Sequence, residues 1–442
     1  MAWTTSAFAA PPHRGDFPPL VVGNNFGVNI HRAGDPDFDL IAAAGMRIVR
    51  LDLTWETTER AKGIYDWSGY DQTLAALRAR RLRPLLILGY SNPIYAAPVT
   101  VRHHGSELTR IAPPSSTDAR AAFVRWAQAA ARHFVSDNPL FEIWNEPNQD
   151  MFWPPRSDPQ QYVELADASC RGLRAAVPTA TIIAPGAAGM PTCNQPAPDL
   201  LVALLASRVT GCLDGVSVHP YLNISDLRET PYNWELLRAL IARSLPPGAA
   251  RPVLISSEWG LSTGGGGIFH HPPDEMAQAF YVVRMMLLNF ASGVPVSIWY
   301  DWKDDGDDPS DAENRFGLVR QNLTPKPAYR ALATAINTLA GTSLVCSSDR
   351  DDGDAALVFA GGGSAGAGRD VTLVGWRASG AVPANLPPSP PARIVGSMDM
   401  FGRPLPGSSP GPGAEPPGVV YFHLRDADPA ALCTLVRSGG RK

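Results

Sequence analysis

The segment FEIWNEPNQ (residues 141–149) decides how this sequence is interpreted, because it places Trp-Asn-Glu-Pro directly after an apolar, strand-like start. Glu and Pro are both disfavoured inside sheets, so a strand that ends on them uses its last residues for something other than packing. The segment therefore predicts a carboxylic acid, Glu146, at the rim of a sheet and beside an aromatic side chain. Whether this acid does chemistry depends on a second carboxylate at the end of another strand.

Strand-like apolar runs alternate with amphipathic, helix-like stretches from residue 20 to about 340. Repeated strand-helix units with apolar rather than alternating strands are typical of a (β/α)8 barrel. A doubly wound open sheet is the alternative, but no G-x-G-x-x-G motif follows any strand to support it. The eight runs are FGVNI (26–30), RIVRLDL (47–53), PLLILGY (84–90), FEIWNE (141–146), TIIAPG (181–186), GVSVHPY (215–221), PVLISSEWG (252–260) and PVSIWYDW (295–302).

The sequence divides into three parts. An extended N-terminal segment (1–19) precedes the catalytic barrel (20–340), and a module over 341–442 contains short strand-like runs separated by Gly- and Pro-rich loops. This module is predicted to be an all-β sandwich accessory domain. Its first strand is also placed to pair with the extended segment before the barrel.

Composition excludes several classes of partner. The chain of 442 residues has a net charge of −4 and no basic run, which argues against nucleic-acid binding. No uninterrupted apolar run reaches the roughly 18 residues that a membrane span needs. The five cysteines show no C-x-x-C spacing, which argues against zinc, and no other metal or cofactor is expected. The oligomeric state is not indicated.

Two features bear on the compartment. Ala7-Phe8-Ala9 matches an A-x-A signal-peptidase site and fits the remnant of a trimmed signal peptide, although a disordered chain end is the plain alternative. Cys346 and Cys433 flank the C-terminal module and would bridge it in an oxidising compartment. Together they predict a secreted or periplasmic protein.

The second carboxylate is Glu258, at the end of the seventh strand. Reacting groups of a (β/α)8 barrel sit at the C-terminal ends of strands, so Glu146 and Glu258 are expected to face each other across the barrel mouth. Retaining glycoside hydrolysis needs two carboxyls roughly 5–5.5 Å apart, one as nucleophile and one as acid and then base. We assign Glu258 as the nucleophile and Glu146 as the acid/base.

Neighbouring strand ends supply groups that would separate the two pKa values. Arg50 and Tyr221 are expected to hold Glu258 ionised, while nearby Trp residues and the charge of Glu258 would raise the pKa of Glu146. Asn145 would donate to the 2-hydroxyl of the sugar. Arg50 also fits an ordinary barrel ion pair. Further predicted substrate contacts are His219, Trp144, Trp259, Trp299 as the floor of the cleavage subsite, and His31, where the two histidines fit plain structural roles equally well.

Two further groups of polar residues are given structural roles. Strand alternation puts Glu142 on the same side as Glu146 but deeper, so Glu142 is expected to be buried and paired. The acidic run 301–313 and the His270-His271 doublet lack the spacing of known metal sites, so no metal is predicted.

The motifs resemble those of one clan of enzymes. FEIWNEPNQDMFWPP, GVSVHPY and LISSEWGLSTGG are similar to the retaining clan A (β/α)8 glycoside hydrolases, and most to glycoside hydrolase family 39, including its bacterial exopolysaccharide-degrading branch. VRLDLTWETTERAKGIYDW, FGLV and TPKPAY support the match, which spans about residues 20–340. The resemblance implies hydrolysis of an equatorial, β-type glycosidic bond with retention and without a cofactor.

The expected function is therefore hydrolysis of an oligo- or polysaccharide, with a bacterial exopolysaccharide cleaved in endo fashion as the first hypothesis. The insertion after the third strand (91–116) would extend an open groove in that case, or would wall off a pocket for an exo-acting β-xylosidase or uronidase-like enzyme. A transglycosylase would use the same residues. A carbohydrate-binding protein on a decayed hydrolase scaffold is the non-enzyme alternative, but binding alone does not require an acid–nucleophile pair.

Overall fold

The computed structural model describes residues 15–103, 105–190, 197–222, 227, 229–245, 248–265, 272–349, 354–361, 369–376, 393–405 and 418–438. The expectations on Ala7–Ala9, on His270 and His271, and on the Gly- and Pro-rich loops of the C-terminal module lie outside these residues.

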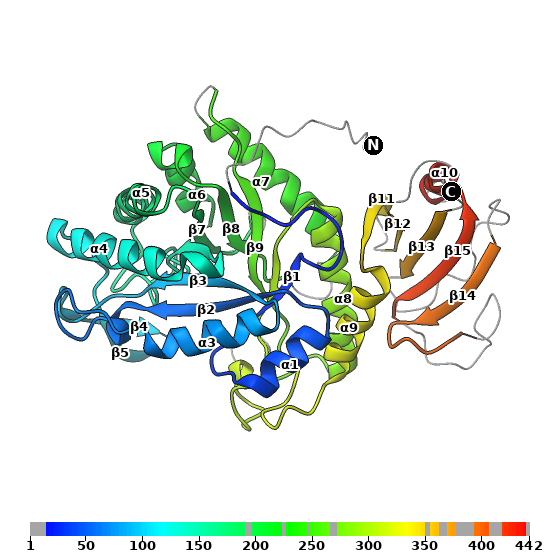
Figure 1. Ribbon diagram of the computed structural model, residues 1–442, viewed down its shortest axis with the longest axis horizontal. Helices are drawn as coiled ribbons and strands as arrows, with labels where there is room; N and C mark the ends of the chain where they lie inside the picture. The colour runs from blue at the N-terminus through cyan, green and yellow to red at the C-terminus, as the bar shows by residue number, and fades with distance from the viewer. Residues whose placement is uncertain are drawn as a thin grey trace.

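Eight parallel strands close into a barrel in the order β1-β10-β9-β8-β7-β6-β3-β2 (Figure 1). This confirms the predicted (β/α)8 fold, and every strand coincides with one of the eight apolar runs. The strands are β1 (Phe26–Asn29), β2 (Ile48–Thr54), β3 (Arg83–Gly89), β6 (Leu140–Ile143), β7 (Thr181–Ala188), β8 (Gly215–His219), β9 (Val253–Trp259) and β10 (Ser297–Trp299).

Helices surround the barrel (Figure 1). In α4 the Oγ of Ser116 caps the first turn by accepting from the Ala119 N–H at 3.2 Å, and Phe123, Trp126 and other residues at helical spacing form the buried face. The helices of the barrel region are α1 (Asp35–Ala43), α2 (Trp55–Thr58), α3 (Ser68–Ala79), α4 (Thr117–Phe134), α5 (Pro159–Ala176), α6 (Ala197–Leu205), α7 (Thr230–Ser244), α8 (Glu275–Ala291) and α9 (Pro327–Leu339), with the 3-10 helices η1 (Val135–Asp137), η2 (Arg208–Gly211) and η4 (Ala312–Arg315).

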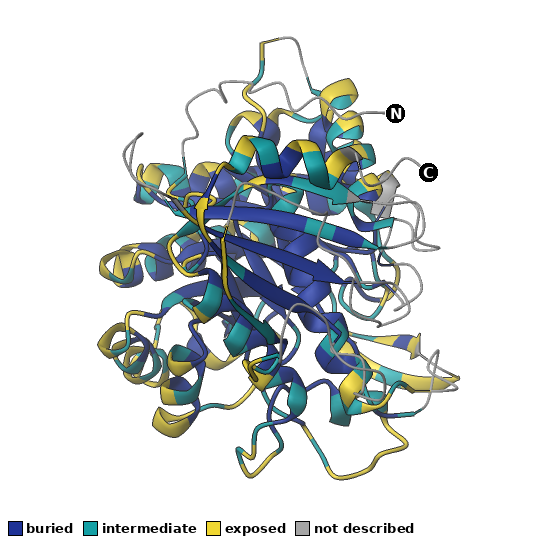
Figure 2. Ribbon diagram, turned by 90° about the vertical axis from the view of Figure 1, so that its right-hand side faces the viewer, coloured by how far each residue is buried: buried dark blue, intermediate teal, exposed yellow. Residues whose placement is uncertain are grey.

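The barrel interior changes from apolar to charged along its axis. On β2, alternation places Ile48, Arg50 and Asp52 on one face. Ile48 belongs to a cluster of branched apolar side chains contributed by β2, β3, β6, β7, β9 and β10, whereas Arg50 is buried among carboxylates. Figure 2 shows the strands as largely buried and the outer helix faces as exposed. The apolar layer thus supports a polar layer at the C-terminal ends of the strands.

The insertion after β3 forms a hairpin that the sequence did not predict. Strands β4 (Pro98–His103) and β5 (Ser106–Ile111) pair in antiparallel register, from Pro98 opposite Ile111 to His103 opposite Ser106. Apart from Val101, most of the described side chains of the hairpin are at least half-exposed.

A five-stranded antiparallel sheet with the order β11-β12-β13-β15-β14 forms the C-terminal module, which confirms the predicted β-module. Over the described residues it is one sheet rather than two packed sheets: one face packs on α8, where Phe359 lies 6.0 Å from Phe290, and helix α10 contacts β11 and β12 (Figure 1). The elements are β11 (Thr342–Asp349), β12 (Ala355–Gly361), β13 (Arg369–Trp376), β14 (Arg393–Asp399), β15 (Val420–Ala427) and α10 (Pro429–Ser438).

The segment before the barrel is tied to this module. The Val22 N–H donates to the Thr342 carbonyl at 2.9 Å, and the Gly341 N–H donates to the Val22 carbonyl at 2.8 Å. The start of the module is therefore bonded to the chain at Val22, just after the extended segment (1–19) for which the pairing was considered. The backbone at Val22, just before β1, therefore links the barrel to the sheet of the C-terminal module.

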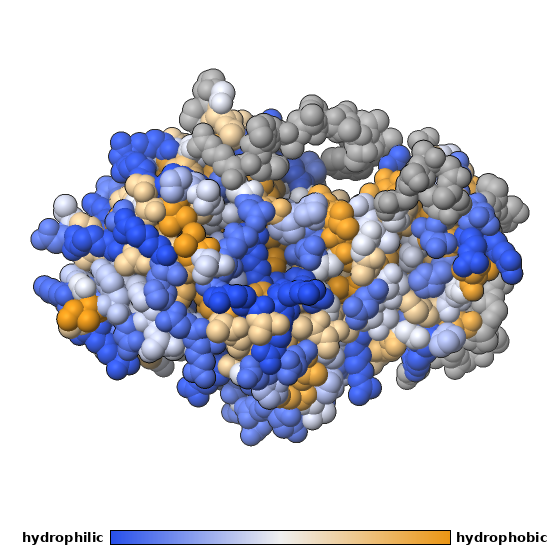
Figure 3. Space-filling view, in the orientation of Figure 1, coloured by the Kyte–Doolittle hydropathy of each residue, from blue (hydrophilic) through white to orange (hydrophobic). Residues whose placement is uncertain are grey.

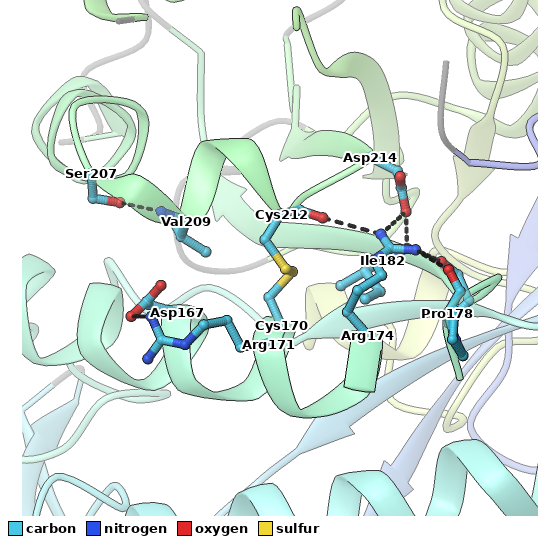
Figure 4. Close-up of a disulfide and its surroundings, with 11 residues drawn as sticks. Asp167, Cys170, Arg171, Arg174, Pro178, Ile182, Ser207, Val209, Cys212 and Asp214 are labelled. Atoms are coloured by element: carbon cyan, nitrogen blue, oxygen red, sulfur yellow. Dashed lines mark hydrogen bonds and ion pairs between the residues drawn. A yellow bond between two sulfur atoms is a disulfide. The ribbon is translucent and has the colours of Figure 1, made fainter. Parts of the chain in front are cut away.

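Two disulfides cross-link the chain. Cys346 and Cys433 join β11 to α10, a bridge that the sequence left open as a possibility, and Cys170 and Cys212 join α5 to the end of η2 (Figure 4). The second pair was not foreseen, because a separation of 42 residues carries no local signal. Beside it, Arg174 bonds Asp214 at 2.8 Å, so the same turn is held covalently and by an ion pair.

The outer surface is of mixed character. Figure 3 shows hydrophilic residues over much of one face, with apolar residues in scattered patches. Within the part of the chain that the structure describes, no helix combines the length and the apolar character needed to cross a membrane.

Candidate active site

Glu146 is held at the rim of the barrel by an unusual backbone. It follows β6 with a φ of +46°, and Trp144 has a φ of +73°. L-residues rarely adopt positive φ, and such conformations gather at functional sites when surrounding contacts stabilise them. Here the Glu146 N–H donates to the Gly186 carbonyl at 2.9 Å. The irregular Trp-Asn-Glu-Pro stretch is thus a turn that directs the carboxylate to the mouth.

Glu258 lies on β9 and faces Glu146. One carboxylate oxygen of each residue and a ring nitrogen of His219 all lie within 4.8 Å of one another. The side chains of Glu146 and Glu258 are 15% and 12% exposed, whereas that of Glu142 is fully buried, so only the first two are open to solvent. The structure therefore brings together the two acids that the sequence singled out, at a separation that suits a retaining pair.

Arg50 is the centre of the polar layer. Its guanidinium donates to Glu258 Oε2 at 2.7 Å, to Glu142 Oε2 at 2.8 Å and to Asn145 Oδ1 at 2.7 Å. It also donates to Asn29 Oδ1 at 3.0 Å. A planar guanidinium with five N–H donors can order several acceptors at once, which a lysine cannot do. Arg50 is therefore both the ion-pair partner of Glu258 and the group that orients Asn145.

Tyr221 supplies the second contact to Glu258. Its hydroxyl donates to Glu258 Oε1 at 2.6 Å, so the two carboxylate oxygens are held by different donors. The two contacts fix the orientation of the carboxylate. This is the set of contacts that the sequence predicted around Glu258.

His219 connects the two acids. Its Nδ1 lies 2.7 Å from Glu146 Oε1, and its Nε2 lies 3.4 Å from Arg50 Nη2. Burial lowers the pKa of His219 to about 4, outweighing the negative charge of Glu258, so the imidazole is neutral at physiological pH. Arginine can only donate, so Nε2 carries the lone pair and the Nδ1–H donates to Glu146. His219 thus positions the carboxylate of Glu146 as a hydrogen-bond donor.

The environment of Glu146 suits a general acid. Burial raises its pKa to about 7, an effect that the charge of Arg50 opposes and that of Glu142 reinforces. The sequence predicted the rise but attributed the electrostatic part to Glu258, whereas the structure places it on Glu142. Burial also disfavours ionisation of Glu142, but the charge of Arg50 and the smaller contributions of His219, Ser217 and Ser257 together outweigh it and lower the pKa of Glu142.

The predicted tryptophans form a packed wall. Trp299 and Trp259 meet edge to face with centroids 5.0 Å apart, and Trp144 packs on Trp153 at 5.2 Å. Each of the three predicted indoles is at most 2% exposed, and each N–H is bonded within the protein. Whether Trp299 forms the floor of a subsite stays a prediction.

Two tyrosines at the mouth were missed. Tyr90 follows β3 and Tyr300 follows β10, both half-buried. The charges of Glu258 and Glu146 contribute to raising the pKa of Tyr90, and that of Glu258 contributes to raising the pKa of Tyr300, although burial is the larger cause for both. The signal was present in the sequence, since both tyrosines stand at strand ends in PLLILGY and PVSIWYDW.

The comparison with known families decides the class. The model of the cellulases, glycosyl hydrolase family 5, matches residues 21–305, which is more than half of the chain. The chain belongs to this family. It is a clan A glycoside hydrolase, as the sequence motifs indicated, and a carbohydrate is its substrate. The comparison with curated protein sequences gives no match.

Solved structures with the same fold include several family 39 enzymes. A family 39 glycoside hydrolase from Bacteroides cellulosilyticus WH2 has 21% identity and a TM-score of 0.68, over 92% of this chain and 81% of that one. The family 39 enzyme of Xanthomonas axonopodis pv. citri has 17% identity and a TM-score of 0.62, over 93% and 96%. A monomeric β-xylosidase from Caulobacter crescentus CB15 has 18% identity and a TM-score of 0.61, over 93% and 98%. At these sequence identities the structural similarity establishes the fold alone. The hydrolase shares this fold with the three enzymes over both the barrel and the β-module.

Proposed function

We propose that this glycoside hydrolase cleaves a β-glycosidic bond with retention, with Glu258 as nucleophile and Glu146 as acid/base. The observation that carries the proposal is the pair of facing carboxylates, whose nearest ligand atoms lie within 4.8 Å. An inverting pair would need a wider gap of roughly 6.5–9.5 Å to hold the attacking water.

In the first step Glu258 attacks the anomeric carbon while Glu146 gives its proton to the leaving oxygen, which forms a glycosyl-enzyme and releases the aglycone. Arg50 and Tyr221 hold the attacking carboxylate, and the raised pKa of Glu146 keeps the proton available near neutral pH. In the second step the ionised Glu146 accepts a proton from water, which attacks the same carbon and frees Glu258. The His219 Nδ1–H stabilises Glu146 in its ionised state between the two steps.

For the substrate we infer a polysaccharide of bacterial origin, an exopolysaccharide cleaved in endo fashion. The hairpin β4–β5 supports this. It follows β3 at the mouth of the barrel, and its mostly exposed side chains would extend the surface along which a long polysaccharide can bind. An exo-acting β-xylosidase is the second candidate, favoured by the shared fold with the Caulobacter crescentus enzyme. A secreted or periplasmic location is supported by the two disulfides, since such bonds persist in oxidising compartments.

Two experiments test these assignments. Glu258→Gln should abolish turnover even of aryl glycosides with activated leaving groups, whereas Glu146→Ala should spare those substrates and be rescued by azide, giving a β-glycosyl azide. An α-azide product, or full activity of Glu258→Gln, would contradict the retaining assignment. Product sizes from purified exopolysaccharides separate the two substrate hypotheses: internal cuts give a ladder of oligosaccharides, and exo action gives monosaccharide alone.

A further inference from the structure

The turn that carries Glu146 lies beside the last residues of β7. Strand β6 ends at Ile143, and its register with β7 ends where Glu142 lies opposite Ile183, but β7 continues to Ala188. Buried backbone N–H and C=O groups need hydrogen-bond partners. On the side that faces β6, the last residues of β7 therefore need partners that do not belong to a strand.

Asn148 supplies these partners for Ala188. Its side-chain Nδ2 donates to the Ala188 carbonyl at 2.8 Å, and its Oδ1 accepts from the Ala188 N–H at 2.9 Å. An amide side chain carries both an acceptor and donors, so Asn148 takes the place of a peptide group of a neighbouring strand. Two residues earlier on β7, the Gly186 carbonyl accepts from the Glu146 N–H at 2.9 Å. The turn is thus bonded to β7 at two points.

The backbone of the turn explains why such bonds are needed. Trp144 and Glu146 have φ values of +73° and +46°, which L-residues keep only where surrounding contacts hold them. Before Glu146, the Trp144 N–H donates to the Leu88 carbonyl on β3 at 3.1 Å. After Glu146, Asn148 bonds Ala188 on β7. The acid therefore stands between two anchors on neighbouring strands of the barrel.

The end of β7 also lies next to the residue that orients the carboxyl group of Glu146. Ala188 is opposite His219 in the parallel pairing of β7 and β8, and the Gly189 N–H donates to the His219 carbonyl at 3.1 Å. His219 Nδ1 in turn lies 2.7 Å from Glu146 Oε1. The backbone and the carboxyl group of Glu146 are thus held against the same two strand ends. A shift of the turn away from β7 would lengthen the contact with His219.

We propose that Asn148 is a positioning residue for the acid/base, because it fixes the turn on β7 so that the Glu146 carboxyl group reaches the glycosidic oxygen. Proton transfer needs the acid within hydrogen-bond reach of that oxygen, and a small displacement removes much of its effect. Asn148 is 5% exposed and its amide is bonded to Ala188, so it acts through Glu146 rather than on the sugar. The inference rests on the proposed function, since it requires Glu146 to be the acid.

The test compares kcat/KM for the phenyl and the dinitrophenyl β-glycoside of a sugar that the wild type cleaves. Asn148→Leu keeps the size of the side chain but has neither donor nor acceptor. Dinitrophenolate leaves without a proton, whereas phenolate needs one, so a misplaced acid harms the phenyl glycoside selectively. We expect a loss of at least about tenfold for the phenyl glycoside and of less than about threefold for the dinitrophenyl glycoside.

Two further variants complete the comparison. Asp150→Ala removes a bond within the same loop, from the Ser157 N–H to Asp150 Oδ1, and should leave both kcat/KM values near those of the wild type. Asn148→Asp keeps the acceptor for the Ala188 N–H but loses the donor when its carboxyl group is ionised. Its loss on the phenyl glycoside, relative to the wild type at the same pH, should therefore shrink as the pH is lowered and the carboxyl group can donate again.

Equal losses on the two glycosides in Asn148→Leu and Asn148→Asp, or no loss in either variant, would overturn the inference and leave Asn148 a role in stability alone. If Asn148→Leu does not fold, Asn148→Asp decides by itself. Glu146→Ala in the same assay separates this outcome from failure of the proposed function. A selective loss on the phenyl glycoside in Glu146→Ala but not in the Asn148 variants refutes the positioning role only, whereas no selective loss in Glu146→Ala refutes the acid assignment itself.

Discussion

Glu142 lies beneath Arg50, and its Oε2 accepts a hydrogen bond of 2.8 Å from Arg50 Nε. Glu142 is fully buried and has no access to substrate, yet its negative charge contributes to raising the pKa of Glu146, four residues further along the chain. Glu142 therefore acts on the site indirectly, through its charge and through its hydrogen bond with Arg50. Arg50 forms ion pairs with two acids: Glu258, the proposed nucleophile, and Glu142, which contributes to raising the pKa of the proposed acid/base Glu146.

Glu142→Gln should lower the pKa of Glu146. The substitution removes a negative charge that favours the protonated form, and it leaves the positive charge of Arg50 less compensated, so both effects have the same sign. We expect the alkaline limb of kcat/KM to move to lower pH by about one unit. Glu56→Gln, an exposed acid on α2 that does not contribute to the pKa shift of Glu146, removes the same charge and should leave the limb in place. An unmoved or alkaline-shifted limb in Glu142→Gln would show that Glu142 does not tune the acid.

The wild-type enzyme should lose activity above about pH 7, because Glu146 must be protonated to cleave and its pKa is about 7. The decline should approach tenfold per pH unit for substrates with poor leaving groups. Aryl glycosides whose leaving groups need no proton should decline far less over the same range. Equal declines for the two substrate types would point to loss of another group, or of the fold, rather than to deprotonation of the acid.

The sequence predicted the fold well because eight apolar runs separated by amphipathic segments admit few arrangements. It also placed Glu146, Glu258, Arg50 and Tyr221 together, since the rule that sites lie at strand ends needs no three-dimensional detail. Pairings across space were harder. Cys170 and Cys212 meet through a turn whose path no local pattern encodes. The alternation of side chains along the strand predicted that Glu142 lies deeper in the barrel than Glu146. It could not show that the charge of Glu142 contributes to raising the pKa of Glu146, because that depends on distances within the fold.

Arg50→Met should destabilise the hydrolase strongly. It leaves the carboxylate of Glu142 buried without its ion-pair partner, and breaking a buried pair from one side costs about 3–5 kcal/mol of unfolding free energy. Urea unfolding followed by circular dichroism measures this loss. The double variant Arg50→Met/Glu142→Gln removes the orphaned charge and should recover at least about 1 kcal/mol relative to Arg50→Met. Additive effects of the two substitutions would mean that the pair does not contribute as a unit.

Glu146→Gln should make the protein more stable while it abolishes the acid function. The folded pKa of Glu146 is about 7 against a usual 4.5, so the unfolded chain releases a proton that the folded one retains. Stability therefore falls as pH rises from about 4.5 to about 7, and the full penalty remains above it. The gain in Tm of Glu146→Gln over the wild type should be near zero at pH 4, grow through this window and level off above pH 7. If the gain in Tm does not depend on pH, the stabilisation by Glu146→Gln does not come from removing the titration of Glu146.

The disulfide between Cys170 and Cys212 should stabilise the barrel independently of the module. It closes a loop with a sequence separation of 42 residues between α5 and η2, which predicts a contribution of about 2–4 kcal/mol. Replacing both cysteines with alanine should lower the urea midpoint by that amount while Glu146 and Glu258, on other elements, keep their geometry and kcat near 25 °C. The matched variant without Cys346 and Cys433 removes a bridge confined to β11 and α10. It should lower the stability of the β-module and leave the unfolding of the barrel closer to that of the wild type, so equal effects of the two double variants would show that barrel and module unfold as one cooperative unit.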